Sequence, residues 1–317
     1  MIVLTGGKTG GHIMPLIALA KEYQSVFYIG ANNSLEERLC KEHGIQFQGM
    51  NLKKKSIKSI LLATIKLKLP EAKAIIATGG YVSFPVLLYG ILHHIPIYLL
   101  EENVIMGKTN HFFSLFSKKV FLTYKLPKMK KKYEKVGLPI LPNQGVKYSY
   151  THLNIDILII GGSLGSKPLC DLAYILSQKY KICLVAGRYH EEYQNIPNCI
   201  VYEYVSDLIY LMKASRLIIS RAGASTTYEI FSLNKPCIIV PSMKTSKNHQ
   251  YLNALYFEKE GCCKLVKENE AKELILQTAD QIIMDSQTIL NMRINQQRIV
   301  QKNSAKKIME CIRRDIE

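Results

Sequence analysis

Two stretches of this chain, Thr5-Gly-Gly-Lys-Thr-Gly-Gly-His12 and Ile160-Gly-Gly-Ser-Leu-Gly165, are glycine-rich turns, and each directly follows an apolar run typical of a buried parallel strand. Glycine allows positive φ and lets backbone N–H groups approach a phosphate at the positive end of the following helix. One such turn is a weak signal. Two in the same context predict two nucleotide-type α/β folds in series.

The length and composition predict about two domains, because 317 residues with 48% hydrophobic content fill one large or two ordinary cores. The formal net charge of +17 favours anionic partners. Nucleic acid, an acidic membrane surface and a phosphorylated substrate all fit that charge, and charge alone does not choose among them.

Several features favour a cytosolic protein. The eight cysteines include no CxxC pair, and Cys262-Cys263 lacks zinc-ligand spacing, so we expect free thiols in a reducing compartment. The first strand is expected within two residues of Met1, which leaves no room for a secretory signal. The uncharged run Tyr81–Leu100 approaches the length of a membrane span, but its two prolines and Gly90 favour a soluble helix followed by a short strand.

Apolar runs alternate with amphipathic helical stretches in both halves, which predicts two parallel, doubly wound sheets with right-handed crossovers. The strands are expected at Ile2–Leu4, Val26–Ile29, Ala74–Ala77, Ile97–Leu100, Lys119–Leu122, Asp156–Ile160, Lys181–Val185, Cys199–Val201, Leu217–Ile219 and Cys237–Val240. Val136–Gly145, rich in proline and glycine, is the expected hinge. We place the domains at residues 1–141 and 142–317, with one or two polar helices after Ala271, and leave open whether the last helix packs back on the N-terminal domain.

Two common nucleotide signatures are excluded. Gly7-Lys8-Thr9 and Gly107-Lys108-Thr109 lack the glycine that a Walker A loop needs five residues before its second one. Neither glycine turn fits GxGxxG in full, so a dinucleotide is disfavoured and we expect no cofactor.

A further turn, Ser220-Arg-Ala-Gly-Ala-Ser-Thr-Thr-Tyr-Glu229, lies between an expected strand and an expected helix. Gly223–Thr226 can hold a diphosphate through backbone donors, or Ser225 or Thr226 can simply cap the helix. Glu229 can accept two hydrogen bonds from a ribose diol or be an ordinary solvated helix residue. The residues alone leave both interpretations open.

Six motifs, in one order from residue 1 to roughly residue 265, resemble the MurG family, the UDP-N-acetylglucosamine transferases of peptidoglycan synthesis. The motifs are Gly6-Gly-Lys-Thr-Gly-Gly-His-Ile-Met-Pro15, Thr78-Gly-Gly-Tyr-Val-Ser83, Glu101-Glu-Asn-Val-Ile-Met-Gly-Lys-Thr-Asn110, Gly161-Gly-Ser-Leu-Gly165, Ser220-Arg-Ala-Gly-Ala-Ser-Thr226 and His249-Gln-Tyr-Leu-Asn-Ala254. The resemblance implies a GT-B glycosyltransferase with two Rossmann-like domains facing a cleft. It implies inverting transfer of GlcNAc from UDP-GlcNAc to the muramoyl 4-hydroxyl of lipid I, giving lipid II, by a peripheral enzyme on the cytoplasmic face of the bacterial cell membrane.

Carried over residue by residue, the resemblance gives three groups of site residues. The catalytic candidates are His12, Glu101 and Tyr81. The donor-binding candidates are Thr9, Gly10, Gly11, Asn103, Ser163, Val205, Arg221, Ala224, Ser225, Thr226, Glu229 and Gln250, with Ser163 at the diphosphate, the Val205 backbone at uracil and Gln250 at the sugar hydroxyls. The acceptor candidates are Ser83 and Asn110.

Inverting transfer needs a base for the acceptor hydroxyl and charge stabilisation for the departing UDP. His12 heads a helix, whose positive end lowers an imidazole pKa and favours the neutral form that a base requires. Glu101 is the rival base. The sequence has no Asp-x-Asp pair, so we expect chemistry without a metal. Arg221 either orients the phosphate turn or is an ordinary ion-paired side chain.

Three positions depart from the family pattern. Leu141 stands where an arginine is common, and Lys167 replaces the usual arginine of the second glycine turn, keeping the charge but losing the bidentate fork. Lys8 stands where a third glycine is common and supplies some of the lost charge if it faces the cleft. These departures bear on donor affinity more than on reaction type.

The stretch Lys53–Lys68 places Ile57, Ile60, Leu61 and Ile65 on one helical stripe with lysines alongside. Such a helix suits an anionic bilayer surface, whereas an ordinary domain helix with its apolar face in the core has the same pattern. The MurG family has its membrane-association patch in this region, so the resemblance favours exposure.

Two alternatives belong to other classes. A nucleic-acid-binding protein fits the charge and the run Lys128–Lys135, but no recognised reading motif accompanies them, so we expect no nucleic-acid partner. A UDP-GlcNAc 2-epimerase of similar fold does not need a lipid-facing helix.

Overall fold

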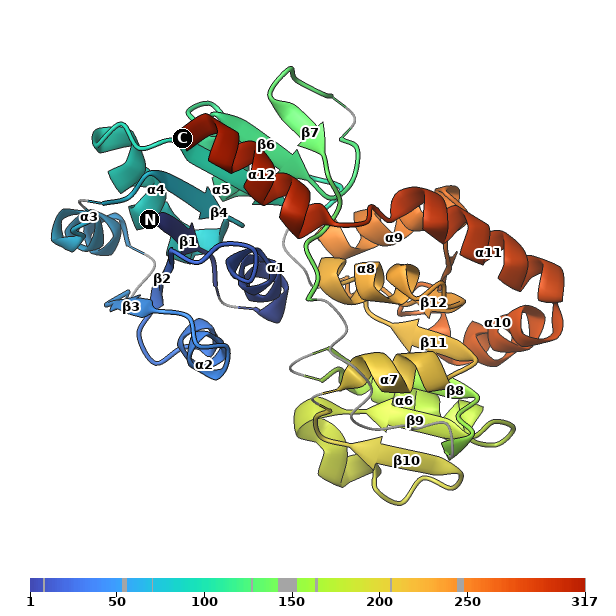
Figure 1. Cartoon of the computed structure of the whole chain (residues 1–317). Helices are drawn as coiled ribbons and strands as arrows, with labels where there is room; N and C mark the ends of the chain where they lie inside the picture. The colour runs from blue at the N-terminus through green and yellow to red at the C-terminus, as the bar shows by residue number, and fades with distance from the viewer. Residues whose placement is uncertain are drawn as a thin grey trace. The chain divides into compact units, whose positions relative to one another are not determined.

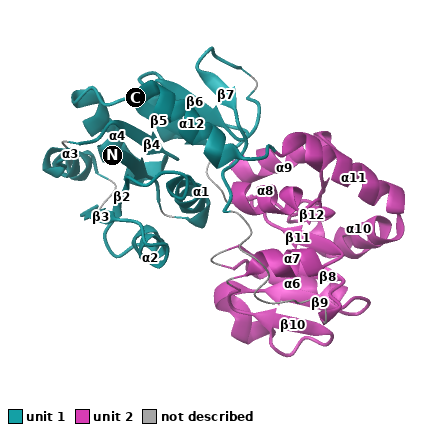
Figure 2. Cartoon of the chain, in the orientation of Figure 1, with its two compact units in different colours: residues 1–142, 301–317 teal, residues 143–300 magenta. Residues whose placement is uncertain are grey.

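The computed structural model describes residues 1–7, 9–52, 56–69, 71–126, 128–141, 153–162, 165–205, 207–243 and 248–316. The chain divides into two compact units (Figure 2). The first consists of residues 1–142 and 301–317, and the second of residues 143–300. The residues 142–145 of the expected hinge lie outside the described part of the chain.

The first unit is built on a seven-stranded parallel sheet (Figure 1). Its strands are β1 (Ile2–Thr5), β2 (Val26–Ala31), β3 (Phe47–Met50), β4 (Ala74–Ala77), β5 (Ile97–Glu101), β6 (Lys119–Leu122) and β7 (Tyr133–Lys135). They lie in the order β3-β2-β1-β4-β5-β6-β7. In register, Val3 of β1 is paired with Phe27 on one side and with Ile75 on the other.

Helices cover both faces of this sheet. They are α1 (Gly10–Ala20), α2 (Leu35–Glu42), α3 (Ile57–Lys66), α4 (Gly80–Leu92), α5 (Lys108–Phe113) and α12 (Ser304–Ile316). Because successive strand residues point to opposite faces, β1 contributes to two cores. Leu4 packs with Ile13 of α1 and Ile308 of α12, whereas Val3 packs with Val86 of α4.

The last helix of the chain, α12, is part of the first unit. Its buried residues Ile308 and Ile312 complete the core beside α1. Asp315 Oδ2 accepts a 2.8 Å hydrogen bond from Tyr98 Oη of β5, and Lys118 Nζ lies 3.3 Å from Asp315 Oδ1. The core contacts and these two polar contacts hold the C-terminal helix on the N-terminal sheet.

The second unit has a six-stranded parallel sheet. Its strands are β8 (Ile157–Ile160), β9 (Ile182–Val185), β10 (Cys199–Tyr202), β11 (Leu217–Ser220), β12 (Cys237–Ile239) and β13 (Lys264–Leu265), in the order β10-β9-β8-β11-β12-β13. Its helices are α6 (Lys167–Leu176), the 3-10 helix η2 (Gly187–Tyr193), α7 (Leu208–Ala214), α8 (Ala224–Ser232), α9 (His249–Lys259), α10 (Ala271–Met284) and α11 (Ser286–Ile299). Ile159 and Leu184 pack with Leu172 of α6 in its main core.

The two doubly wound parallel sheets predicted from the alternating pattern are confirmed, and both have the Rossmann strand order. All ten predicted strands occur, with bounds within two residues of those expected. The strands β3, β7 and β13 were not predicted, and each lies at an edge of its sheet. An edge strand has a neighbour on one side only, so it tolerates more polar residues than a central strand. Gln48-Gly49 and Glu134 interrupt the hydrophobic pattern of β3 and β7, which is why the sequence did not indicate them.

The prediction of one or two helices after Ala271 was wrong, since the described residues there form three: α10, α11 and α12. Asp285 separates the first two, because its carboxylate accepts 2.9 Å and 2.6 Å hydrogen bonds from Gln287 N and Thr288 Oγ1 and so caps α11. Asn303, at φ 59°, lies in the turn before α12. The run Tyr81–Leu100 forms most of α4 and then β5, and none of the helices in the described ranges combines the length and apolarity needed to cross a membrane.

Candidate active site

Glycine-containing turns follow the strands at which the strand order of each sheet reverses. The reversal lies between β1 and β4 in the first unit and between β8 and β11 in the second. Open parallel sheets bind ligands at the carboxyl ends of the strands at this switch point. The first glycine turn follows β1, Gly79-Gly80 follows β4, the second glycine turn follows β8 and Gly223 follows β11. Each unit therefore has one candidate ligand site of its own.

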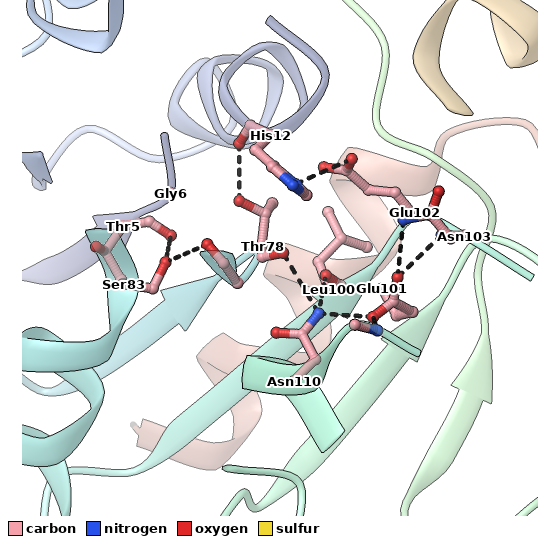
Figure 3. Close-up of polar contacts among 12 residues, drawn as sticks. Thr5, Gly6, His12, Thr78, Ser83, Leu100, Glu101, Glu102, Asn103 and Asn110 are labelled. Carbon is pink, nitrogen blue, oxygen red and sulfur yellow. Dashed lines mark hydrogen bonds and ion pairs between the residues drawn. The ribbon is translucent and has the colours of Figure 1, made fainter. Parts of the chain in front are cut away.

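The first glycine turn is packed closely against the end of β4. Thr78 Oγ1 donates a 2.8 Å hydrogen bond to the carbonyl oxygen of His12 (Figure 3). A Cβ on Gly6 would lie 2.1 Å from that same hydroxyl oxygen, so a side chain at Gly6 would displace Thr78. The glycine thus permits the approach that positions the start of α1.

The start of α1 is accessible. Thr9 is its exposed N-cap residue and makes no side-chain capping bond, and a Cβ on Gly10 would meet nothing within 4 Å. Gly11 is half-buried in the first turn. These three predicted donor positions form an open helix N-terminus, while Lys8 lies outside the described residues.

His12, in the first turn of α1, meets a carboxylate from the end of β5. Its Nδ1 lies 3.2 Å from Glu102 Oε2 (Figure 3). Glu102 is 3% exposed, and its pKa is raised, chiefly because burial disfavours the charged form. The imidazole of His12 opposes that rise, and the neighbouring Glu101 adds to it. An Nδ1–H that donates to Glu102 fixes the tautomer in which Nε2 is the basic nitrogen.

Glu101, the rival base, is surrounded by hydrogen-bond donors. Oε1 accepts from Asn103 N at 3.0 Å and from Asn103 Nδ2 at 3.2 Å, and Oε2 accepts from Gly107 N and Asn110 Nδ2, both at 2.9 Å (Figure 3). A carboxylate has about four lone-pair positions, and here the described residues fill four. Glu101 thus holds the loop to Gly107 in place, and Asn103, expected at the donor, is one of its partners. These contacts favour His12 as the base.

Ser83 and Asn110 were expected to contact the acceptor, and the structure corrects this. Both are buried, at 0% and 2% exposure. Ser83 Oγ donates to the carbonyl oxygen of Gly79 at 2.7 Å, and Asn110 Nδ2 donates to that of Leu100 at 3.1 Å. The Ser83 hydroxyl and the Asn110 Nδ2 group join strand ends, because buried donors must find partners inside the protein. Tyr81 is half-buried in the first turn of α4.

The second glycine turn has the backbone that only glycine adopts easily. Gly162 and Gly165 have φ of 82° and 74°. A Cβ on Gly165 would lie 2.1 Å from the carbonyl oxygen of Ala186 after β9, whereas one on Gly162 would meet nothing within 4 Å. The turn is therefore tight on the side of β9 and open at Gly162. Ser163, expected at the diphosphate, lies outside the described residues.

The turn after β11 leads into a helix whose N-cap residue is Gly223. Ser225 and Thr226 lie inside the first turn of α8, so the interpretation that one of them is the N-cap is wrong. A Cβ on Gly223 would meet nothing within 4 Å, and Ala224 follows it as the first helical residue. First-turn N–H groups of a helix have no intrahelical acceptor and form an anion-binding end.

Glu229 lies in the second turn of α8, four residues after Ser225 and on the same side of the helix. The residue is half-buried, and burial raises the pKa of its carboxyl group to about 7. Among the residues that the structure describes, none hydrogen-bonds to this carboxylate. A half-buried acceptor without a partner among the described residues, behind a phosphate-type turn, is what a ribose diol would satisfy.

Arg221 connects the two turns of the second unit. Its Nε and one terminal nitrogen lie 3.0 Å and 2.6 Å from Ser166 Oγ, and the other terminal nitrogen donates to the carbonyl oxygen of Val240 at 3.0 Å. It is also ion-paired with Glu268. Arg221 is therefore ion-paired, and it also joins Ser166, which follows the second glycine turn, to the ends of β11 and β12. Its orientation of the Gly223–Thr226 turn stays a prediction.

Two further donor candidates lie in unit 2. Val205 is a half-buried residue in the loop after β10. Gln250, the second residue of α9, accepts a 3.0 Å hydrogen bond at Oε1 from Ser242 N, so its carbonyl end is bound to the loop after β12.

Glu102, Ser166 and Glu268 were not among the candidates from sequence. Glu102 could have been suspected from its place beside Glu101 at a strand end. The contacts of Ser166 and Glu268 with Arg221 join residues 55 and 47 positions away, and no local pattern indicates them.

The chain matches two domain models of one enzyme family. Residues 2–122 match the glycosyltransferase family 28 N-terminal domain, and residues 156–312 match the glycosyltransferase family 28 C-terminal domain. The chain belongs to glycosyltransferase family 28. The matched segments contain the turns at both switch points.

Similar proteins cover the same length. A protein of Sulfurihydrogenibium sp. (strain YO3AOP1) named UDP-N-acetylglucosamine--N-acetylmuramyl-(pentapeptide) pyrophosphoryl-undecaprenol N-acetylglucosamine transferase is 29% identical, covering 100% of this chain and 99% of the relative. A protein of the same name from Bacillus cytotoxicus is 27% identical, with 98% of each covered.

Solved structures agree with this assignment. MurG of Acinetobacter baumannii superposes with a TM-score of 0.82 at 25% identity and 99% coverage of both chains. A putative UDP-N-acetylglucosamine 2-epimerase from Listeria monocytogenes has a TM-score of 0.75, covering 100% of this chain and 96% of its own, but is 12% identical and shares the fold alone. The GT-B fold and the resemblance to the MurG family are confirmed.

In this family 28 chain, α3 exposes most of its apolar stripe. Ile57, Leu61 and Ile65 are 77%, 46% and 78% exposed, so the interpretation that they belong to the core is wrong. Ile60 is half-buried, and Leu62, at 58% exposure, joins the stripe instead. Residues 53–55 lie outside the described part of the chain.

The departures from the family pattern can also be located. Lys167, at the start of α6, is exposed, and its Nζ lies 2.7 Å from Glu192 Oε2, so it is ion-paired at the surface. Leu141 packs against the α1 and α12 core of the first unit. Neither position provides an unpaired cation to a donor.

Proposed function

We propose that this chain transfers GlcNAc from UDP-GlcNAc to the 4-hydroxyl of the muramoyl-pentapeptide of lipid I, giving lipid II and UDP with inversion at the anomeric carbon. The names of the full-length relatives and the likeness to A. baumannii MurG support these substrates. The observation in the structure that supports the proposal best is Glu229, a half-buried carboxylate without a partner among the described residues, one turn behind a phosphate-type turn.

The donor is bound by the second unit. The N–H groups at the start of α8 donate hydrogen bonds to the diphosphate, with Ser225 and Thr226 adding hydroxyl donors. Glu229 accepts hydrogen bonds from both ribose hydroxyls, and the Val205 backbone pairs with uracil. Gln250, whose Oε1 is bound by Ser242 N, has its amide N–H groups to offer the sugar.

The acceptor reacts at His12. Nε2 takes the proton of the muramoyl 4-hydroxyl, and the oxygen bonds to C1 of GlcNAc on the face opposite the leaving group, so the configuration inverts. The bond between C1 and the β-phosphate oxygen breaks, and its electron pair leaves with UDP. Glu102 stabilises the imidazolium that forms, because its Oε2 lies 3.2 Å from His12 Nδ1.

The leaving diphosphate gains negative charge, and the oriented N–H groups of α8 stabilise it without reorganising. The lack of an Asp-x-Asp pair in the sequence favours a reaction that needs no divalent metal. A chelator should therefore leave the transfer rate unchanged.

The lipid-linked acceptor requires access to a membrane surface. The exposed residues Ile57, Leu61, Leu62 and Ile65 of α3, with Lys58 and Lys66 on the same helix, fit an anionic bilayer on the cytoplasmic side. A peripheral position on the cell membrane follows from this part of the proposal.

A 2-epimerase is the second candidate, because a putative epimerase shares the fold. The two are separated by incubating the protein with UDP-[14C]GlcNAc and a short-chain lipid I analogue, then resolving the lipid and nucleotide fractions. Transferase activity moves the label into lipid II and releases UDP. Label that stays in the nucleotide fraction as the 2-epimer contradicts the proposal. A matched reaction without the acceptor is the control.

A further inference from the structure

The connection after β9 lies between the second glycine turn, where the sequence analysis expects the diphosphate, and the Val205 loop, to which the proposed function gives uracil. In the sheet order β10-β9-β8, the carboxyl end of β9 is flanked by the second glycine turn after β8 and by the Val205 loop after β10. Gly187, the first residue of η2, donates a 3.1 Å hydrogen bond to the carbonyl oxygen of Glu203 in the β10 loop. On the other side, a Cβ on Gly165 would lie 3.1 Å from Tyr189 Cδ2. The start of η2 thus touches both loops.

This connection presents an exposed cation. Arg188 is exposed, its guanidinium carbon lies 4.9 Å from the centre of the Tyr189 ring, and one terminal nitrogen donates a 2.8 Å hydrogen bond to Tyr189 Oη. Stacking on the ring and bonding to the hydroxyl hold the planar head group beside the glycine turn. Its remaining N–H groups face no carboxylate among the described residues.

The neighbouring cations are already paired. Lys167 is ion-paired with Glu192 at 2.7 Å, and Arg221 with Glu268. Among the lysines and arginines that the structure describes around the second glycine turn, Arg188 is the one whose charge is left for a ligand.

A diphosphate at the start of α8 and beside the second glycine turn needs a counter-charge, and a guanidinium can bind two phosphate oxygens at once. We propose that Arg188 is the side chain of this chain that binds the diphosphate of the donor, replacing the cations absent at Leu141 and paired at Lys167. Tyr189 is a positioning residue that holds Arg188 against the turn. The proposal rests on the proposed function, since it assigns a residue to the same donor site.

The test is calorimetric titration of the full-length chain with UDP, UMP and uridine. Arg188→Gln should weaken UDP binding by about ten- to hundredfold, the range for a lost charge-assisted hydrogen bond, and leave uridine binding within about twofold. UMP should show an intermediate loss. Tyr189→Phe, which keeps the ring and removes the 2.8 Å anchor, should weaken UDP binding less than Arg188→Gln does.

Arg298→Gln is the matched control, because Arg298 is an exposed arginine of α11 whose removal changes the net charge by the same amount. It should bind all three ligands like the wild type. Unchanged UDP affinity in Arg188→Gln, or an equal loss for uridine and UDP, overturns the proposal while the proposed function stands. A wild-type chain that does not bind UDP overturns both. Melting curves of each variant should show that the fold is retained, because Arg188 is exposed.

Discussion

At the residue scale, Glu229 links the affinity for the donor to pH. Its pKa is raised to about 7 by burial, and the ionised form is the stronger acceptor for ribose hydroxyls. UDP should therefore bind more weakly as the pH falls through 7, by about tenfold between pH 8 and pH 6 for one group of that pKa. Calorimetry on Glu229→Gln provides the control, because the variant keeps only the pH dependence of UDP itself.

The same residue predicts a change in stability of opposite sign. Between the ordinary glutamate pKa and 7, the folded chain binds more protons at Glu229 than the unfolded chain does, so stability falls as the pH rises through that range. Glu229→Gln should thus melt at a higher temperature than the wild type at pH 8, and at the same temperature at pH 4. A lower melting temperature of the variant at pH 8 would show that the carboxylate has a stabilising partner.

His12 and Glu101 should separate catalysis from stability. His12→Ala should lower kcat with little change in UDP affinity or melting temperature, because the imidazole acts on the acceptor.

Glu101→Gln should destabilise the fold by about 1–3 kcal/mol, since an amide N–H₂ would face donors such as Gly107 N. Glu102→Gln, which leaves the loop donors of Glu101 untouched, should reduce kcat and alter its pH profile. Full turnover in His12→Ala with loss in a folded Glu101→Gln would assign the base to Glu101.

At this scale the sequence predicts residue types at a site better than it predicts their contacts. His12 and Glu229 were predicted from the glycine-containing turns that precede them in the sequence. The buried bonds of Ser83 and Asn110 depend on which backbone carbonyls lie beside them, and Glu102 faces His12 across 90 positions of chain. Such pairings form only when β1 and β5 are assembled in one sheet.

At the scale of elements, α3 tests the membrane proposal. Changing Ile57 and Leu61 together to Ser should reduce sedimentation with anionic vesicles several-fold and leave the melting temperature unchanged, since both side chains are exposed. The control is the double change of Leu274 and Leu290 to Ser, which removes similar exposed apolar side chains from α10 and α11. Vesicle binding that is equal in both variants would exclude α3 as the docking element.

A second prediction at this scale concerns α12. Ile308 is 0% exposed in the core of the first unit, so Ile308→Ala should lower the free energy of unfolding by about 2–5 kcal/mol, the range for buried Ile to Ala. Denaturant unfolding measures it, with Leu290→Ala, at a site 49% exposed, as the control. An effect no larger than that of the control would mean that α12 does not complete this core.

Secondary structure was predicted well where apolar runs are buried on both faces, as in β1 and β4. It was missed where the strand lies at an edge and carries polar residues, as in β3 and β7, and where Asp285 divides one polar helical stretch into two helices. Edge pairing and capping depend on neighbours that the local pattern does not include.

At the scale of the whole molecule, the proposed function assigns the acceptor chemistry to the first unit and donor binding to the second. The first has the His12–Glu102 pair and the exposed helix α3, and the second has the phosphate-type turns and Glu229. The net charge of +17 suits two substrates that both contain a diphosphate and a surface of anionic lipid. Substitutions at the His12–Glu102 pair should therefore leave donor binding unchanged, and substitutions at Glu229 should weaken donor binding.

The most direct measurement is transfer of labelled GlcNAc to a lipid I analogue, with a chelator present, by the wild type, His12→Ala, Glu229→Ala and the double variant, alongside UDP affinity for each. We expect labelled lipid II and an equal amount of UDP from the wild type. His12→Ala should lose kcat without losing UDP affinity, and Glu229→Ala should lose UDP affinity without losing kcat. The two losses of kcat/KM, expressed as free energies, should add in the double variant. Label that never enters the lipid fraction of the wild-type reaction would contradict the proposed transfer of GlcNAc to lipid I.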